Sequence, residues 1–271
     1  MDPTEERFRA LARSAPWRWR SLRFTVGNRR VGEDRAVHTV RARVRKPGRL
    51  RVEDLSGAVL DRTADLNVAE PPAVDLAADG LLARAPDEPP AFRFDFEPPM
   101  YQNYHWVAML DPYELADGRD DDGTAVAGTE ILDLAAVEHH GRAAWQARLR
   151  TTRRYDPRCG CCPLLFSAES EAAEDHEPPP GTVFADAYLV RLDVATGVCV
   201  YSEDLGGSAA GQGHDVAIED VDEDMPDELF GPPRSHRHRF APYGEPSRTD
   251  LRDLTAYRDD PTLRFTALPD Q

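Results

Sequence analysis

Most of the chain alternates apolar and polar side chains with a period of two. In residues 37–45, Val40, Ala42 and Val44 share one face while arginines occupy the other, as in a half-buried antiparallel strand. Lys46, Pro47 and Gly48 then form a turn. The other segments that we expect to form strands are a stretch beginning at residue 22 and residues 49–53, 58–62, 129–137, 143–153, 186–192, 198–203 and 214–220.

Helical spacing of apolar residues is limited to two short segments. Thr4 is a suitable N-cap for a helix over residues 4–13, whose first turn carries acidic side chains. Apolar and aromatic residues recur at helical spacing within residues 101–115, where Pro112 is expected to interrupt the helix. Because the chain shows no β-α-β alternation, it predicts an α+β, β-rich domain of antiparallel strands with helical embellishments.

Proline-rich and polar segments suggest how the domain is organised. Residues 69–100 are acidic and contain Pro-Pro pairs, which cannot continue a helix or occupy a central strand. We therefore expect a long insert there, with one helical turn near residues 74–83. The folded domain is predicted to span residues 1–230, and residues 231–271 to form a polar tail with one short helix near 249–257.

Charge and composition restrict the classes of partner. The 271 residues include 49 acidic and 33 basic side chains, for a net charge of -16. This excess disfavours nucleic acid and anionic membrane surfaces as partners. The longest apolar runs are far shorter than the about 20 residues of a spanning helix, so we expect no membrane span. Residues 1–8 lack an apolar export segment, which predicts a cytoplasmic protein; the oligomeric state does not follow from the sequence.

Three motifs distributed over residues 4–230 point to a family. They are the hairpin Arg45-Lys46-Pro47-Gly48-Arg49-Leu50-Arg51-Val52-Glu53, the strand-end turn Leu192-Asp193-Val194-Ala195-Thr196-Gly197 and the closing segment Asp227-Glu228-Leu229-Phe230. Together they resemble the outer-membrane lipoprotein carriers (the LolA/LolB-like family, including the related sigma-factor regulatory lipoprotein-binding domains). The resemblance implies a single strongly curved antiparallel sheet, or incomplete barrel, with an N-terminal helix and helical lid inserts. It also implies an apolar cavity for acyl chains.

An aromatic and methionine-rich segment is the first candidate site. Its side chains either pack a helix onto the sheet or line the mouth of a cavity, where such groups adapt to apolar guests. On a curved half-barrel one helix can do both. We therefore expect a non-enzymatic binding protein for an apolar small molecule, a lipid or a protein segment. The candidate ligand-binding residues are Tyr101, Tyr104, Trp106, Met109, Tyr113 and Trp145.

The cysteines are the second candidate site. Cys159, Cys161 and Cys162 lie close together in the sequence, and Cys199 could supply a fourth thiolate for tetrahedral zinc. The spacing departs from the usual two-residue knuckle. A redox switch is the second alternative, because Arg158 beside the thiols could lower a pKa; unreactive cysteines are the third. Zinc is thus the one cofactor considered, and a thiol-based regulatory or zinc-stabilised protein is the alternative function.

Catalytic motifs are not recognisable in the sequence. An exposed loop is expected at residues 117–123, where Gly118 breaks the register of a calcium-binding EF-hand, and another at residues 167–181. No spacing links any histidine to a cysteine nucleophile. The protein is therefore expected not to be an enzyme. The histidines considered as bases are His139, His140, His176 and His214.

Overall fold

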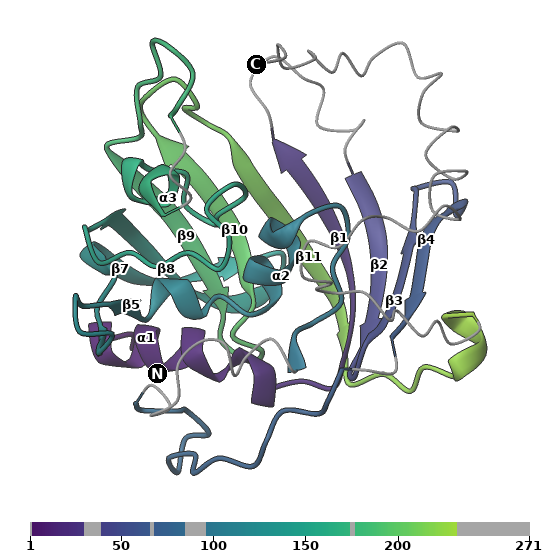
Figure 1. Ribbon diagram of the computed structural model, residues 1–271. Helices are drawn as coiled ribbons and strands as arrows, with labels where there is room; N and C mark the ends of the chain where they lie inside the picture. The colour runs from purple at the N-terminus through teal and green to yellow at the C-terminus, as the bar shows by residue number, and fades with distance from the viewer. Residues whose placement is uncertain (1, 30–38, 66–67, 85–95, 174–176, 232–271) are drawn as a thin grey trace, which may run out of the picture. The chain divides into compact units, whose positions relative to one another are not determined.

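The computed structural model of the protein describes residues 2–29, 39–65, 68–84, 96–173 and 177–231. Within these ranges, nine antiparallel strands form one curved, open sheet in the order β4-β3-β2-β1-β11-β10-β9-β8-β7 (Figure 1). The predicted antiparallel, β-rich fold class is confirmed. The strands are β1 (Ser21–Arg29), β2 (Thr39–Arg45), β3 (Arg49–Glu53), β4 (Val59–Ala64), β7 (Thr129–His139), β8 (Arg142–Thr151), β9 (Ala187–Asp193), β10 (Cys199–Leu205) and β11 (Gly213–Val221).

Two meanders make up the sheet. Strands β1 to β4 form the first, strands β7 to β11 form the second, and pairing of β1 with β11 joins them. In the connection between β4 and β7, the segment that contains Trp106 and Met109 packs on the inner face of the sheet, the face that carries the core. A separate two-stranded ribbon, β5 (Gly118–Arg119) and β6 (Ala125–Val126), lies in this connection.

The helices are short and two of them cover the inner face. They are α1 (Glu5–Ser14), α2 (Tyr104–Leu110) and α3 (Ala168–Ala172), with 3-10 turns at Ala15–Trp17, Tyr113–Leu115 and Asp227–Leu229. Phe8 and Leu11 of α1 join the same core as Trp106 and Met109 of α2 (Figure 1). In the part of the chain that the structure describes, no helix is long and apolar enough to cross a membrane.

The predicted alternation sets the strand register. Ala42 and Val44 are fully buried and pair with Val52 and Leu50 of β3, so the apolar faces of both strands meet the core. The turn between the strands requires glycine. Gly48 has a φ of +63°, and a Cβ there would lie 2.2 Å from the carbonyl oxygen of Asp65.

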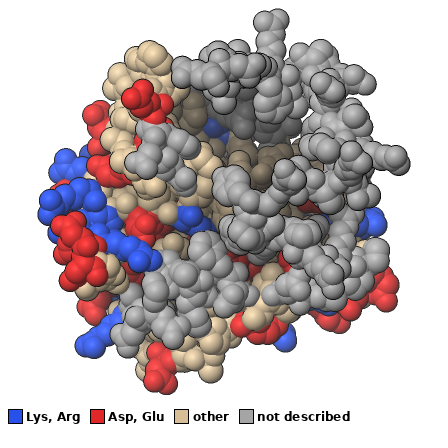
Figure 2. Space-filling model, viewed as in Figure 1, with Lys and Arg blue, Asp and Glu red and all other residues tan. Residues whose placement is uncertain are grey.

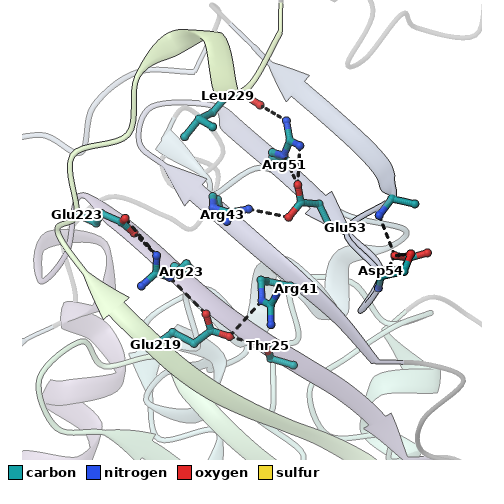
Figure 3. A network of polar contacts seen from close by, with 12 residues as sticks. Arg23, Thr25, Arg41, Arg43, Arg51, Glu53, Asp54, Glu219, Glu223 and Leu229 are labelled. Atoms are coloured by element: carbon teal, nitrogen blue, oxygen red, sulfur yellow. Dashed lines mark hydrogen bonds and ion pairs between the residues drawn. The ribbon is translucent and has the colours of Figure 1, made fainter.

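The arginines of these strands lie on the outer face, within a network of ion pairs (Figure 3). Arg23 contacts Glu219 of β11 and Glu223, which follows β11 in the sequence. Arg43 and Arg51 both contact Glu53 of β3. Burial opposes ionisation of Glu53, but hydrogen bonds from the two arginines outweigh it and lower its pKa. The arginine stripe is therefore neutralised by the protein's own carboxylates.

Other charged side chains are also mixed in sign on the face shown in Figure 2. There, blue and red residues lie interspersed along the left side, over the region of β5 and β7. The pairs in this region include Arg119 with Asp156, 2.7 Å apart, and Arg150 with Glu130, 2.8 Å apart. The acidic surplus of the sequence does not gather there into a patch of one sign.

Several irregular segments differ from expectation. The loop expected at residues 167–181 contains α3, because the Ser167 side chain accepts the Ser170 N–H and the Ser170 side chain accepts in return. Residues 117–123 include β5. The helix expected over 101–115 is confined to α2 and a turn after Pro112, as the interruption predicted.

Two further expectations meet different outcomes. The helical turn near residues 74–83 is instead a tight turn closed by the Gly80 N–H on the carbonyl of Ala77. The tail helix near 249–257 lies outside the described residues.

Candidate functional site

A pocket of about 630 Å³ lies between the inner face of the sheet and α2. Strands β1, β2, β4, β10 and β11 contribute one wall, residues 101–109 a second, and residues 161–166 a third. In Figure 1, α2 lies in front of the centre of the sheet, where β1, β11 and β10 meet.

The apolar part of the pocket includes half of the predicted binding set. Tyr101, Trp106 and Met109 line it, opposite Val26 and Leu60 of the sheet. The Trp106 ring lies edge-on to the Tyr101 ring, with centroids 5.3 Å apart. This contact between the two rings stabilises the aromatic side of the pocket.

The other predicted residues lie elsewhere. Tyr104, Tyr113 and Trp145 are not among the lining residues. The Arg158 guanidinium lies 4.8 Å from the Tyr113 ring centroid, and the Arg7 guanidinium 5.5 Å from that of Trp145. Tyr113 and Trp145 are therefore buried in the core, and each ring has an arginine guanidinium beside it.

One end of the pocket is polar. Along three neighbouring strands the inner-face side chains change from apolar to polar toward the same end of the sheet. These triplets are Phe24, Val26 and Asn28 in β1, Ile218, Val216 and His214 in β11, and Val200, Ser202 and Asp204 in β10. Because paired residues of neighbouring strands project from the same face, the polar ends lie together.

Charged groups complete this polar end. Asp204 lines the pocket, and burial, reinforced by the charge of Glu203, raises its pKa to about 7. Arg29 lines it as well and donates to the Tyr201 hydroxyl at 2.6 Å. The pocket is therefore amphipathic, in contrast to the wholly apolar cavity that the family resemblance implies.

Two buried histidines connect the walls of the pocket. His105 Nδ1 lies 2.8 Å from the Pro163 carbonyl and His214 Nε2 lies 2.8 Å from the Cys199 carbonyl, while His105 Nε2 and His214 Nδ1 face each other at 3.0 Å. A neutral imidazole carries one N–H, so two neutral rings can supply protons to only two of these three contacts. The Ser202 hydroxyl lies 2.9 Å from His214 Nδ1, within hydrogen-bond distance.

The protonation state of this pair follows from its burial. Burial lowers the pKa of His105, and burial together with the neighbouring His105 lowers that of His214 to about 3. Both rings are neutral at neutral pH. They therefore hold the segment after the cysteines against α2 and the sheet, and His214 is a weak base.

Three of the four predicted thiols come together. The Sγ atom of Cys161 lies 2.9 Å from that of Cys159 and 3.6 Å from that of Cys162, and the third separation is 3.4 Å. Cys161 and Cys162 also line the pocket. Cys199 is fully buried at the start of β10, its thiol donates to the Tyr201 carbonyl, and it does not belong to this group.

The expected effect of Arg158 on the thiols is wrong for Cys162. The Arg158 guanidinium is buried and contacts carboxylates of Glu97 and Asp111 at 2.5 and 2.6 Å, so its charge is already balanced. Burial, with the adjacent thiols, raises the pKa of Cys162 to about 12. Burial also raises that of Cys199 to about 12.

A second group of possible ligands lies on the other face of the sheet. His140 Nε2 is 2.7 Å from Asp215 Oδ1, and His139 Nε2 is 3.4 Å from the same atom. His139 also contacts the Val216 carbonyl. The imidazoles are thus bound within the sheet, and no sequence spacing predicted their meeting. His176 lies outside the described residues.

Sequence reasoning missed His105, Asp204 and Glu114. The carboxylate of Glu114 is fully buried and accepts from the Tyr155 hydroxyl and from the backbone N–H groups of Arg158 and Leu164. A signal was available for Asp204, because with Ser202 it puts two polar residues on the inner-face register of β10. None was available for Glu114, whose partners come from distant residues.

Comparison with known proteins gives one distant structural likeness. No protein-family model matches the chain, and no curated protein matches it either. Among solved structures, MucB is similar with 13% sequence identity and a TM-score of 0.39. The match covers 84% of this chain and 62% of the MucB chain. This is a distant structural relationship.

Proposed function

We propose that this protein is a non-enzymatic binding protein that holds an amphipathic ligand, or an apolar segment of a partner, between the sheet and α2. The observation that supports the proposal is the pocket of about 630 Å³, with Trp106 and Met109 opposite Val26 and Leu60. Pockets of roughly 300–1,000 Å³ with mainly apolar walls and a few polar groups are typical of small-molecule sites.

The chemistry of the lining favours a ligand with an apolar body and a hydrogen-bonding head. The aromatic ring of Trp106 and the flexible Met109 side chain adapt to apolar groups. Asn28 and Asp204 at the other end offer an amide and a titratable carboxyl. A lipid or another small amphiphile fits this division better than a uniformly apolar molecule.

A hydrolytic alternative is less well supported. Ser202 lines the pocket and contacts His214, which resembles the nucleophile and base of an acyl transferase. A general base is most effective with a pKa near the working pH. Because the pKa of His214 is about 3, it would activate the hydroxyl poorly at neutral pH. The proposal also places the protein in the cytoplasm, where thiols stay reduced.

Titration with a fluorescent fatty acid and with its methyl ester tests the proposal. Leu60 lines the pocket whereas Val59, its neighbour in β4, does not, and the two are similarly exposed at 50% and 39%. L60E should weaken binding of both probes at least about tenfold, equivalent to about 1.4 kcal/mol. V59E adds the same charge on the opposite face and should change affinity less than about twofold.

Native mass spectrometry of gently purified protein supplies an independent measurement. One amphiphile per chain, lost in L60E and retained in V59E, would support the assignment. An absence of saturable binding by the unmodified protein, or equal losses in the two variants, would refute it.

A further inference from the structure

We propose that Cys159, Cys161 and Cys162 form a three-thiolate site for a soft metal ion such as Zn²⁺ or Cu⁺, and that Cys199 takes no part in it. The proposal does not rest on the function proposed above, although Cys161 and Cys162 also line the pocket. It replaces the four-cysteine site considered from the sequence with one that a single short loop supplies.

The sulfur geometry is close to what such an ion requires. With Zn–S bonds of about 2.3 Å in a tetrahedral site, thiolate sulfurs lie about 3.8 Å apart. The observed separations of 2.9, 3.4 and 3.6 Å require the sulfurs to spread by about 0.2 to 0.9 Å. Cys161 is exposed and the other two are partly buried, so an ion can reach all three.

The loop that carries the thiols is fixed at both ends. Glu114 Oε2 accepts from the Arg158 N–H at 3.0 Å, and its Oε1 accepts from the Leu164 N–H at 2.8 Å. These two residues directly flank the segment 159–163. His105 holds the Pro163 carbonyl at 2.8 Å from the side of α2. Such anchoring pre-organises the ligands and reduces the entropy that metal binding would cost.

The charge around the thiols favours a metal over free thiolates. The guanidinium of Arg158 is engaged by Glu97 and Asp111, so it does not compensate thiolate charge. Three adjacent thiolates repel one another, which a bound cation would relieve. A backbone hydrogen bond from Tyr104 reaches Cys162 and would stabilise that sulfur as a ligand.

The protein supplies three ligands within the part of the chain that the structure describes. The grouped thiols include no fourth cysteine, histidine or carboxylate. Soft thiolate sites select Zn²⁺ and Cu⁺, and Cu⁺ needs no fourth ligand, whereas Zn²⁺ would take a water molecule. Binding of Zn²⁺ replaces three S–H bonds by three Zn–S bonds and releases three protons, leaving a complex of charge -1.

Anaerobic titration of the reduced, metal-free protein with Cd²⁺ tests the site, because cadmium thiolates absorb in the ultraviolet. The absorbance should saturate at one Cd²⁺ per chain with proton release, and the softer Cu⁺ should displace the probe. C161S should weaken binding at least about 100-fold. C199A, the matched control, should change affinity less than about threefold. Failure to saturate, or equal losses in both variants, would overturn the proposal.

Alkylation of the unmodified protein, followed by mass spectrometry, makes the test independent of how the variants fold. Cd²⁺ should protect Cys159, Cys161 and Cys162 from iodoacetamide, whereas Cys199 should be unreactive with and without metal until the chain is unfolded. Unprotected loop thiols in the presence of excess Cd²⁺ would contradict the site. So would a disulfide among them that persists under reducing conditions.

Discussion

The strongest test of the structure is removal of the Arg158 guanidinium, which lies between two buried carboxylates. Its Nη1 is 2.5 Å from Glu97 Oε1 and its Nη2 is 2.6 Å from Asp111 Oδ2, and all three side chains are at most 2% exposed. These contacts tie the loop that carries the cysteines to the end of α2 and to residue 97. We expect R158M to keep most of the apolar stem but remove the guanidinium charge from both buried carboxylates.

The expected cost follows from this burial. Removing one partner of a buried ion pair typically costs about 3–5 kcal/mol, because the other charge stays buried without compensation. For a domain of about 150–250 residues, each kcal/mol lowers Tm by about 2–4 °C. R158M should therefore lower Tm by about 6–20 °C. Adding E97Q and D111N should recover part of this loss, because the remaining charges cause most of it.

A matched control separates burial from the mere loss of an arginine. Arg150 pairs with Glu130 at 2.8 Å, but these side chains are 53% and 52% exposed. R150M should lower stability far less than R158M, because ion pairs between exposed side chains contribute little. Urea unfolding followed by circular dichroism, with thermal scans, gives both values. A loss in R158M no larger than that in R150M would show that the buried triad does not stabilise the fold as described.

The remaining predictions concern Lys46, which is buried, and Asp204, which is half-buried. The Lys46 ammonium donates to the carbonyls of Pro16 and Trp19 at 2.7 and 3.1 Å. K46M should therefore lower the free energy of unfolding, measured in urea, by about 1–3 kcal/mol. A loss below about 0.5 kcal/mol would contradict this role. Asp204, whose pKa rises from 3.8 to about 7, binds its proton more readily in the folded state, so its ionisation destabilises the fold as pH rises through 7. D204N should be more stable than the unmodified protein by about 2 kcal/mol at pH 8, after allowance for partial exposure, and this advantage should shrink steadily as the pH falls from 7 toward 3.8; a difference independent of pH would refute the assignment.

The strands could be predicted because their signal is local. Alternation of side chains in β2 identified the buried face containing Ala42 and Val44, and in β8 the face containing Trp145 and Leu149. Short helices carry a weaker signal. The five residues of α3 depend on a reciprocal cap between Ser167 and Ser170 rather than on apolar spacing.

The site could be predicted only in part, since alternation identifies an apolar face but not what covers it. Trp106 and Trp145 are both apolar-face residues, yet the first lines the pocket while the second is buried under Arg7. The thiols show the same division. Three neighbours in the sequence meet, whereas a bulge at the start of β10 directs Cys199 into the core. Such outcomes depend on tertiary packing, which the local pattern does not contain.

The polar end of the pocket, however, follows from the side-chain pattern of the strands. Asn28 and His214 each follow apolar residues at the next alternate position, Asp204 follows Ser202 on the same face of β10, and antiparallel pairing brings these positions to the same end of the sheet. Polar groups left without partners when water is displaced cost about 1–3 kcal/mol each. A pure hydrocarbon that filled the pocket would incur that cost at Asn28 and Asp204, whereas an amphiphile can place its head there. The strand register thus favours a ligand with one polar end and fixes the end of the sheet at which that head would bind.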